Sequence, residues 1–153
     1  MKSRKAVVLF SGGLDSTTAL CWALDRGYAC EAVSFDYGQR HNRETFSARR
    51  IARFLGVKLY EIRLAFPWLG VSSIIDKKKR LPDRRLSKIG AGGIPSTYVP
   101  GRNLVFASIG VSLADAAGAE AVVLGPNFID HSGYPDCRPQ FYRALEKAVA
   151  AGT

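Results

Sequence analysis

Short apolar runs alternate with stretches of helical periodicity in the first part of the chain. Ala6–Phe10, Cys30–Phe35 and Val57–Ile62 predict buried strands, while Asp15–Arg26 and Asn42–Leu55 predict helices. The inward-facing residues expected of the two helices are Ala19, Leu20, Ala23 and Leu24, followed by Phe46, Ile51, Phe54 and Leu55. Alternating strands and helices predict an α/β fold, a three-layer αβα domain with a parallel twisted sheet.

The pattern changes in an insert at about residues 63–102, which is basic and rich in Gly, Pro and Ser. An insert of this length in a compact domain is usually an active-site loop or a disordered segment. After it we expect a helix from Asn103 to Ala117, a strand at Ala121–Leu124 and a last helix from Pro139 to Ala150. A chain of 153 residues is expected to form a single domain, residues 1–153.

The turn after the first strand reads Ser11-Gly12-Gly13-Leu14-Asp15-Ser16. Its small residues are expected to leave backbone N–H groups uncovered, and it opens a helix whose first amides and dipole attract anions. We therefore predict a polyphosphate site. No Lys follows the glycines, which excludes the GxxxxGK[ST] loop, and the spacing is not GxGxxG. An ordinary strand–helix turn is the alternative, and the preceding strand and following polar residues disfavour it.

Polar residues gather in the other loops that follow predicted strands, where parallel sheets bind ligands. In Asp36–His41, backbone groups are expected near an adenine and Arg40 or His41 near phosphate; a simple turn at Gly38 is the alternative. In the loop before the third helix, Arg102 is suited to bidentate recognition of phosphate or carboxylate, whereas Asn103 is expected to cap the helix.

The densest polar cluster is Asp130–Pro139, which holds two carboxylates, a thiol and a Tyr that is able to stack on a heterocycle. Nucleophilic catalysis by Cys137 with His131 is one interpretation. Recognition of a planar, acidic substrate by this loop is the favoured one. Asp136 could equally be a helix cap.

A net charge of +9 favours anionic partners. Much of this charge lies in Lys77–Lys88, which we interpret as a solvated loop, with an RNA-binding patch as the alternative. Cys21, Cys30 and Cys137 form neither a disulfide framework nor a zinc pattern, and the first two are expected in the core. No apolar run reaches membrane-spanning length and no signal peptide is recognised, so a cytoplasmic protein is expected.

Five segments of the chain are distinctive when taken together: SGGLDSTTA, SFDYGQRH, VSS at 71–73, IPSTYVPGRN and DHSGYPDCRP. In sequence and in order they resemble the 7-cyano-7-deazaguanine synthase family of the PP-loop ATP pyrophosphatase superfamily. It implies an adenine-nucleotide α-hydrolase-like PP-loop fold. It also implies a ligase that forms C–N bonds, converting 7-carboxy-7-deazaguanine and ammonia to 7-cyano-7-deazaguanine through adenylated intermediates in queuosine biosynthesis. ATP is the implied nucleotide, and Mg²⁺ is expected with it.

The family's zinc-binding cysteine cluster and its last sheet strand would lie beyond Thr153. The chain is therefore expected to be an N-terminal fragment, or half of a split protein, that lacks the Zn²⁺ ligands and is inactive alone. The alternatives are a PP-loop enzyme that adenylates a base in tRNA and a non-catalytic nucleotide-binding fragment. Neither nucleic acid nor membrane is an expected partner, and a homodimer is left open.

The candidate site residues fall into three groups. The catalytic candidates are Asp15, Ser16, Arg102, Asp136 and Arg138. The nucleotide-binding candidates are Phe10, Ser11, Gly12, Gly13, Leu14, Asp15, Ser16, Thr17, Thr18, Ala19, Leu20, Asp36, Tyr37, Gln39 and Arg40. The substrate-binding candidates are Tyr98, Arg102, Asn103, Asp130, Ser132 and Tyr134. No metal ligands are assigned.

Overall fold

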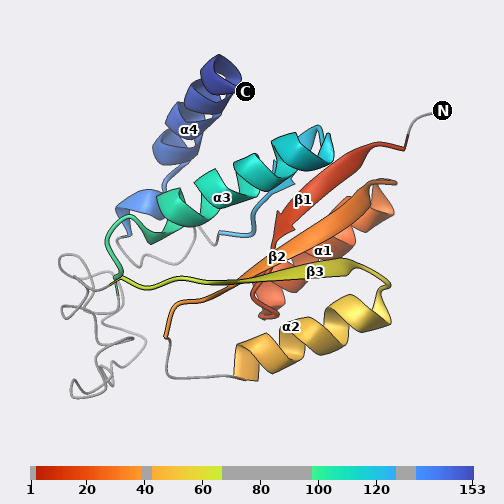
Figure 1. Ribbon diagram of the computed structural model, residues 1–153. Coiled ribbons are helices and arrows are strands. Elements are labelled where there is room, and N and C mark those ends of the chain that lie inside the picture. The colour runs from red at the N-terminus through yellow and green to blue at the C-terminus, as the bar shows by residue number, and fades with distance from the viewer. Residues whose placement is uncertain (1–2, 39–42, 67–97, 127–133) are drawn as a thin grey trace.

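A computed structural model describes residues 3–38, 43–66, 98–126 and 134–153 (Figure 1). Strands and helices alternate along the chain as the hydrophobic pattern predicts. The elements are β1 (Lys5–Leu9), α1 (Leu14–Asp25), β2 (Ala29–Asp36), α2 (Arg43–Phe54), β3 (Lys58–Arg63), α3 (Arg102–Ala117), β4 (Ala121–Val123), the 3₁₀ turn η2 (Pro135–Cys137) and α4 (Pro139–Gly152). Most of the insert, with Lys77–Lys88, lies outside the described residues.

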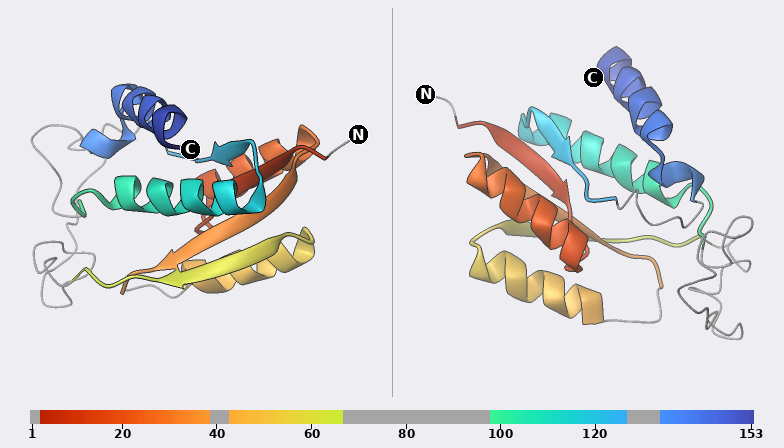
Figure 2. Two further views of the ribbon diagram at one scale, coloured as in Figure 1. Left: turned by 45° about the horizontal axis from the view of Figure 1, so that its top comes forward. Right: turned by 180° about the vertical axis from the view of Figure 1, so that it is seen from behind.

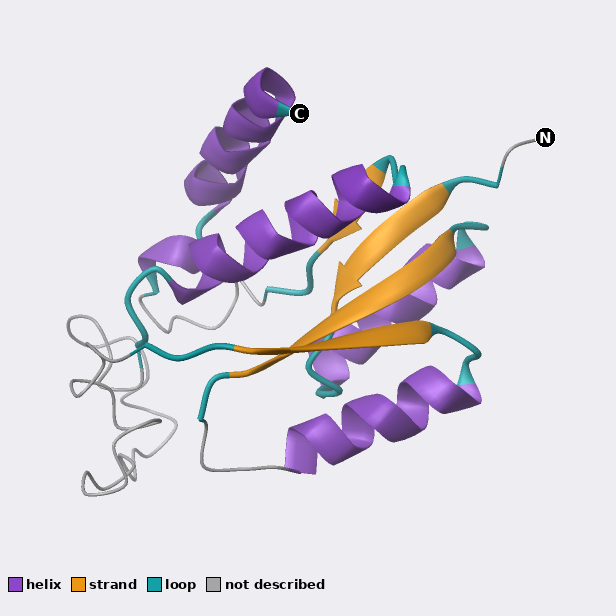
Figure 3. Ribbon diagram, viewed as in Figure 1, coloured by secondary structure: helices purple, strands orange, loops and turns teal. Residues whose placement is uncertain are grey.

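The strands form one parallel sheet of 4 strands in the order β3-β2-β1-β4 (Figure 3). The chain first builds outward from β1 through β2 to β3, and then returns to add β4 on the other side of β1. The strand order therefore reverses between β1 and β4. Open α/β sheets bind their ligands where the strand order reverses, in the crevice beyond the carboxyl ends of the strands. The prediction of a parallel α/β sheet is confirmed.

Helices cover both faces of the sheet, so the domain has three layers (Figure 2). α1 and α2 pack on one face with Val8, Leu20 and Ala32, whereas α3 packs on the other with Val7 and Val33. Adjacent residues of β1 thus point into different cores and both are fully buried. This two-sided burial explains why the strands read as apolar runs rather than alternating patterns.

The inward face of α2 differs from the prediction. Phe46 and Phe54 were expected to point inward, but they are 62% and 88% exposed. The residues that this helix buries completely are Ala48 and Ala52. The expected inward position of Ile51 is confirmed by its packing against the same core. Small side chains face the sheet because the backbone of α2 lies very close to the turn after β1, as described below.

The cysteines also depart in part from their predicted places. Cys21 is exposed on α1, so its prediction as a core residue was wrong. Cys30 on β2 is partly buried and packs against the core, and burial raises the pKa of its thiol. The difference follows from position, because Cys21 lies on the outer side of a helix whose inner side carries Leu20 and Ala23.

α3 approaches the sheet through small residues. Ala107, Gly110 and Ala114 are its buried positions. A Cβ at Gly110 would lie 2.7 Å from Leu9 Cδ2, so only glycine fits between the helix and β1 without a shift. The helix ends at Gly118, whose φ of 62° is left-handed, as the predicted stop requires.

α4 begins at Pro139 as predicted and packs mainly against η2, projecting away from the sheet (Figures 1 and 2). Proline suits the first helical turn because its missing N–H would have no partner there. None of the residues of α4 is fully buried in the part of the chain that the structure describes. No helix among the described residues is both long and apolar enough to cross a membrane.

Candidate nucleotide and substrate site

The turn Ser11–Ser16, here called the glycine turn, joins β1 to α1 and is closed from inside by Ser16. The Ser16 hydroxyl donates to the carbonyl of Gly13 at 3.1 Å and accepts from the backbone N–H of Ser11 at 3.3 Å. Its Oγ also lies 3.1 Å from Ser11 Oγ. Ser16 is nearly buried, so this hydroxyl fixes the shape of the turn rather than facing solvent.

The amides available to an anion differ from those predicted. Ser11 N–H donates to Ser16 Oγ, and Gly13 N–H donates to Ser11 Oγ at 3.2 Å, so these two amides are not bare. The first regular bond of α1 runs from Thr17 N–H to the carbonyl of Gly13, at 3.0 Å. The amides of the first turn precede that bond, and no side chain of the N-cap residue Gly13 covers them. The uncovered amides at the start of α1 are therefore those around Leu14 and Asp15, where the helix dipole is positive and an anion is favoured.

The two glycines of the turn have different tasks. Gly12 has a φ of +81°, and a Cβ there would lie 2.4 Å from the backbone nitrogen of Ala48 on α2. Only glycine satisfies both conditions. Gly13 has ordinary extended geometry, with φ −79°, and a Cβ there would lie 3.3 Å from Ser11 Oγ. Gly12 is thus required by the fold, whereas Gly13 borders the uncovered amides at the start of α1.

Gly125 occupies a close contact beside the candidate site that the sequence analysis did not foresee. It follows β4, and a Cβ at this residue would lie 2.8 Å from the carbonyl oxygen of Asp15. The loops that leave β1 and β4 therefore touch at the point where the strand order reverses. A glycine directly after a predicted strand was the signal available in the sequence.

The remaining nucleotide-binding candidates around α1 are placed as follows. Asp15 is exposed in the first turn of the helix. Thr17 and Thr18 donate their hydroxyl groups to the carbonyls of Gly13 and Leu14, at 2.8 and 3.0 Å. Phe10 and Leu20 contribute their side chains to the hydrophobic core, with exposures of 2% and 0%, so neither side chain is available to a nucleotide. Ala19 lies beside Gly125.

Arg102 and Tyr37, predicted separately as site residues, lie together. Arg102 Nη1 donates to the Tyr37 hydroxyl at 3.0 Å, and the guanidinium carbon is 5.7 Å from the centre of the ring. Tyr37 leaves β2 through a turn in which Asp36 Oδ1 accepts from Gly38 N–H at 3.2 Å. Arg102 is the first residue of α3. Two loops far apart in sequence thus share one polar contact.

An aromatic cluster lies beside this contact. Phe106 of α3 stacks on Phe35 of β2 with ring centres 4.0 Å apart, and it meets Tyr37 at 5.4 Å. Phe66 meets Tyr37 edge-on at 6.3 Å. The sequence analysis did not foresee this cluster. It links the ring of Phe106 to Tyr37, the residue that contacts Arg102.

Asn103 and Asp136 bind one another, which corrects the predicted capping role of Asn103 and supports the alternative in which Asp136 is a helix cap. Asn103 was expected to cap α3, but the N-cap position is Gly101, and the cap comes from elsewhere. The Asp136 carboxylate accepts from Asn103 N–H at 3.1 Å, while the Asn103 side-chain amide donates to the Asp136 carbonyl at 3.1 Å. The same amide lies 3.4 Å from Cys137 Sγ. Asp136 is only 7% exposed, so it caps α3 from a distant loop instead of facing a substrate.

Tyr98 and Tyr134, both substrate-binding candidates, stack on each other with ring centres 5.8 Å apart. The Tyr98 hydroxyl accepts from Gly101 N–H at 3.3 Å. Arg138 is exposed at the junction of η2 and α4. Next to it, burial raises the pKa of Tyr142, and the neighbouring Cys137 and Asp136 raise it further.

Several candidates fall outside the described residues, and they remain predictions. They are Gln39, Arg40, His41, Asp130, His131 and Ser132. The described ranges contain no group of three or more His, Cys, Asp or Glu side chains arranged to hold a metal ion.

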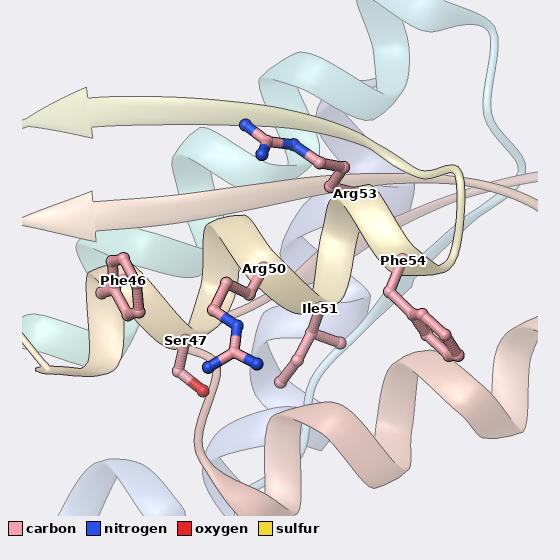
Figure 4. Close-up of a pocket in the computed structure, with 6 residues that line it drawn as sticks. All are labelled: Phe46, Ser47, Arg50, Ile51, Arg53 and Phe54. Atoms are coloured by element: carbon pink, nitrogen blue, oxygen red, sulfur yellow. The ribbon is translucent and has the colours of Figure 1, made fainter.

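A hollow on the outer side of α2 contains none of the predicted site residues (Figure 4). It is lined by Phe46, Ser47, Arg50, Ile51, Arg53 and Phe54. The Arg50 guanidinium carbon lies 5.8 Å from the centre of the Phe46 ring. The candidate site is therefore the loop region beyond the sheet rather than this hollow.

Comparison with known proteins gives one consistent result. The family model described as "Queuosine biosynthesis protein QueC" matches residues 5–153. The 7-cyano-7-deazaguanine synthase of Thermoplasma acidophilum is 46% identical over 153 residues, which are 100% of this chain and 63% of that protein. The synthase of Acetivibrio thermocellus is 45% identical, over 98% of this chain and 65% of its own length. The chain thus spans slightly less than two thirds of these relatives.

Among solved structures, a 4-thiouridine synthetase–RNA complex with bound ATP has a TM-score of 0.59 and 26% identity. The likeness covers 97% of this chain and 41% of that one. The same arrangement of sheet and helices therefore occurs in a protein solved with ATP.

Proposed function

The chain belongs to the QueC family of queuosine biosynthesis proteins, and from this membership we propose that the protein is a ligase that makes 7-cyano-7-deazaguanine. The proposed substrates are 7-carboxy-7-deazaguanine, ammonia and ATP. The observation that carries the proposal is the uncovered start of α1, set against Gly125 where the strand order reverses. The proposed location of the reaction is the cytoplasm.

At the nucleotide end, the first-turn amides around Leu14 and Asp15 hold the phosphates, and pyrophosphate is stabilised there as it leaves. The Asp15 carboxylate is exposed beside those amides and would hold Mg²⁺, which neutralises phosphate charge when it is bound. No described residues fit a zinc site, and no step depends on zinc.

At the substrate end, Arg102 binds the carboxylate of the deazapurine. Tyr37 takes one donor of its guanidinium, and the group has further N–H donors in the same plane. The stacked Tyr98 and Tyr134 offer an aromatic surface for the heterocycle. The aromatic rings and the arginine together suit a molecule that is flat and carries one acidic group.

The chemistry follows from the need to remove oxygen from carbon. A carboxylate oxygen attacks the α-phosphorus of ATP, and pyrophosphate departs. Ammonia attacks the acyl carbon, the C–O bond to AMP breaks, and loss of a proton leaves the amide. In a second round the amide oxygen attacks the α-phosphorus of another ATP, pyrophosphate departs, and the nitrogen loses one proton. Elimination of AMP with loss of the remaining proton from nitrogen then gives the nitrile. The residues above orient the reactants and stabilise the departing pyrophosphate.

The test uses the complete protein with ATP, 7-carboxy-7-deazaguanine and ammonium. We expect AMP, pyrophosphate and the nitrile to appear together, as followed by liquid chromatography and mass spectrometry. Asp15→Asn should slow nitrile formation by about tenfold or more. Asp25→Asn is the matched control, because Asp25 is exposed at the other end of the same helix. Folded protein that forms none of the three products would refute the proposal.

The likeness to the 4-thiouridine synthetase–RNA complex supports a second candidate, an enzyme that adenylates a base within tRNA. It predicts tRNA binding at physiological ionic strength, with an affinity that falls steeply as salt is added. A fluorescence titration with tRNA, repeated at several salt concentrations, distinguishes this candidate from the first.

A further inference from the structure

We propose that Asp136 is a positioning residue: with Asn103 it ties η2 to the first turn of α3 and so sets the direction of Arg102. This inference rests on the proposed function, because the substrate carboxylate is what Arg102 is expected to meet. Asp136 carries a carboxylate in the densest polar cluster of the chain, where a role as general acid or base is the obvious alternative. A positioning role and an acid–base role of Asp136 make opposite predictions for the activity of Asp136→Asn.

The contact is reciprocal, and we call it the Asn103–Asp136 clamp. Asn103 donates from its backbone to the Asp136 side chain and from its side chain to the Asp136 backbone, at 3.1 Å in each case. A carboxylate in this place satisfies a first-turn amide and lies at the positive end of the dipole of α3. Gly101, at the N-cap position, has no side chain for the task.

The clamp closes a ring of contacts around Arg102. Tyr134 directly precedes η2 and stacks on Tyr98. Tyr98 accepts the backbone N–H of Gly101, and Arg102 and Asn103 follow in the chain. The ring then returns through Asp136 to η2. Releasing Asp136 would free η2 from α3 and allow Arg102 and the two tyrosines to move independently.

The geometry also argues against direct chemistry by Asp136. Its side chain is almost fully buried, and one of its oxygens already accepts a structural hydrogen bond. Asparagine at this position keeps a side-chain oxygen that accepts the same bond, but it cannot exchange a proton. Alanine removes the acceptor and leaves the Asn103 amide without its partner.

The experiment compares Asp136→Asn and Asp136→Ala in the complete protein. Steady-state rates are measured against 7-carboxy-7-deazaguanine and against ATP across a range of pH. Asp136→Ala should raise the KM for the deazapurine by about tenfold or more, with a smaller change in the KM for ATP. Asp136→Asn should restore most of that loss and keep the pH profile of the wild type. Asp115→Ala, at the exposed far end of α3, is the matched control.

Hydrogen exchange at the Asn103 amide provides a readout that needs no turnover. Exchange should be slow in the wild type and in Asp136→Asn, and about tenfold faster in Asp136→Ala. If Asp136→Ala does not fold, Asn103→Ala replaces it, because that change removes the side-chain arm and keeps the backbone cap. Wild-type protein that makes no nitrile overturns the proposed function, while the exchange rates still decide the clamp. Equal loss of activity in Asp136→Asn and Asp136→Ala, with an altered pH profile and unchanged exchange, would overturn the inference.

Discussion

Arg102 Nη1 donates to the hydroxyl of Tyr37 at 3.0 Å, which joins the start of α3 to the turn that follows β2. The two residues are 65 positions apart in the sequence, so their contact holds together two segments that the chain alone would not bring near each other. Tyr37 is in turn held against Phe106, four positions after Arg102 on the same helix. These contacts therefore hold the side chain of Arg102, which we assign to substrate binding, in a defined position.

Tyr37→Phe tests the value of that contact. The substitution keeps the ring and removes the oxygen that accepts from Arg102, so the KM for the deazapurine should rise by about threefold to tenfold. The effect on kcat should be smaller, because the reacting phosphates are held elsewhere. Steady-state kinetics measure both constants. Tyr28→Phe is the matched control, since its hydroxyl accepts from Arg4 near the opposite end of the sheet; an equal effect from it would remove the special role of Tyr37.

The two glycines of the glycine turn should respond differently to alanine. Gly12→Ala places a Cβ against the backbone of α2 at a positive φ, and the free energy of unfolding should fall by about 2–4 kcal/mol. Gly13→Ala keeps an allowed backbone, so stability should change by less than about 1 kcal/mol while ATP binding weakens. Denaturant unfolding and nucleotide titration measure the two effects. Similar unfolding curves for both variants would show that the close approach of α2 has been misjudged.

The exposed and buried faces of α2 give a test of the corrected packing. Phe54→Ser replaces an exposed ring and should change the free energy of unfolding by less than about 0.5 kcal/mol. Ala52→Leu adds volume where the helix touches the sheet and should destabilise the fold by about 1–3 kcal/mol. Thermal or denaturant unfolding reports both values. A larger loss of stability in Phe54→Ser than in Ala52→Leu would show that Phe54 is buried and that the described packing of α2 is wrong.

The cysteines should differ in reactivity. Cys21 is exposed, whereas Cys30 is partly buried and burial raises the pKa of its thiol. Alkylation at about pH 8 followed by peptide mapping should modify Cys21 before Cys30. Because the folded state holds the Cys30 proton to higher pH than the unfolded chain does, the stability contribution is present below the unfolded pKa and is lost as pH rises through the folded pKa. Cys30→Ala should therefore reduce the fall in stability at alkaline pH.

The sequence predicted the strands and the inner face of α1 because long apolar side chains repeat there. On α2 it wrongly placed Phe46 and Phe54 inward and passed over Ala48 and Ala52, because alanine gives a weak hydrophobic signal. The reason for alanine there, the close approach of Gly12, lies on another element. The local rule for helix caps failed at Asn103 for a related reason. The carboxylate that caps α3 belongs to Asp136, from a different loop, and no local pattern reveals such a pairing.

For the site candidates too, local features could be predicted from the sequence, whereas contacts between distant segments could not. Arg102, Tyr37, Tyr98 and Tyr134 were chosen as candidates from their residue types and their places in loops, and their roles stay predictions. The pattern could not show which of them touch one another, since that depends on strand order. Gly125 was passed over because its importance comes from the carbonyl of Asp15, which lies beside it only once β4 pairs with β1.

If a nucleotide binds at the start of α1 as we propose, the contact between Gly125 and Asp15 couples its affinity to the seating of the short strand β4. A ligand that orders the beginning of α1 would then also favour the pairing of β4 with β1, and by thermodynamic linkage a well-seated β4 would tighten binding.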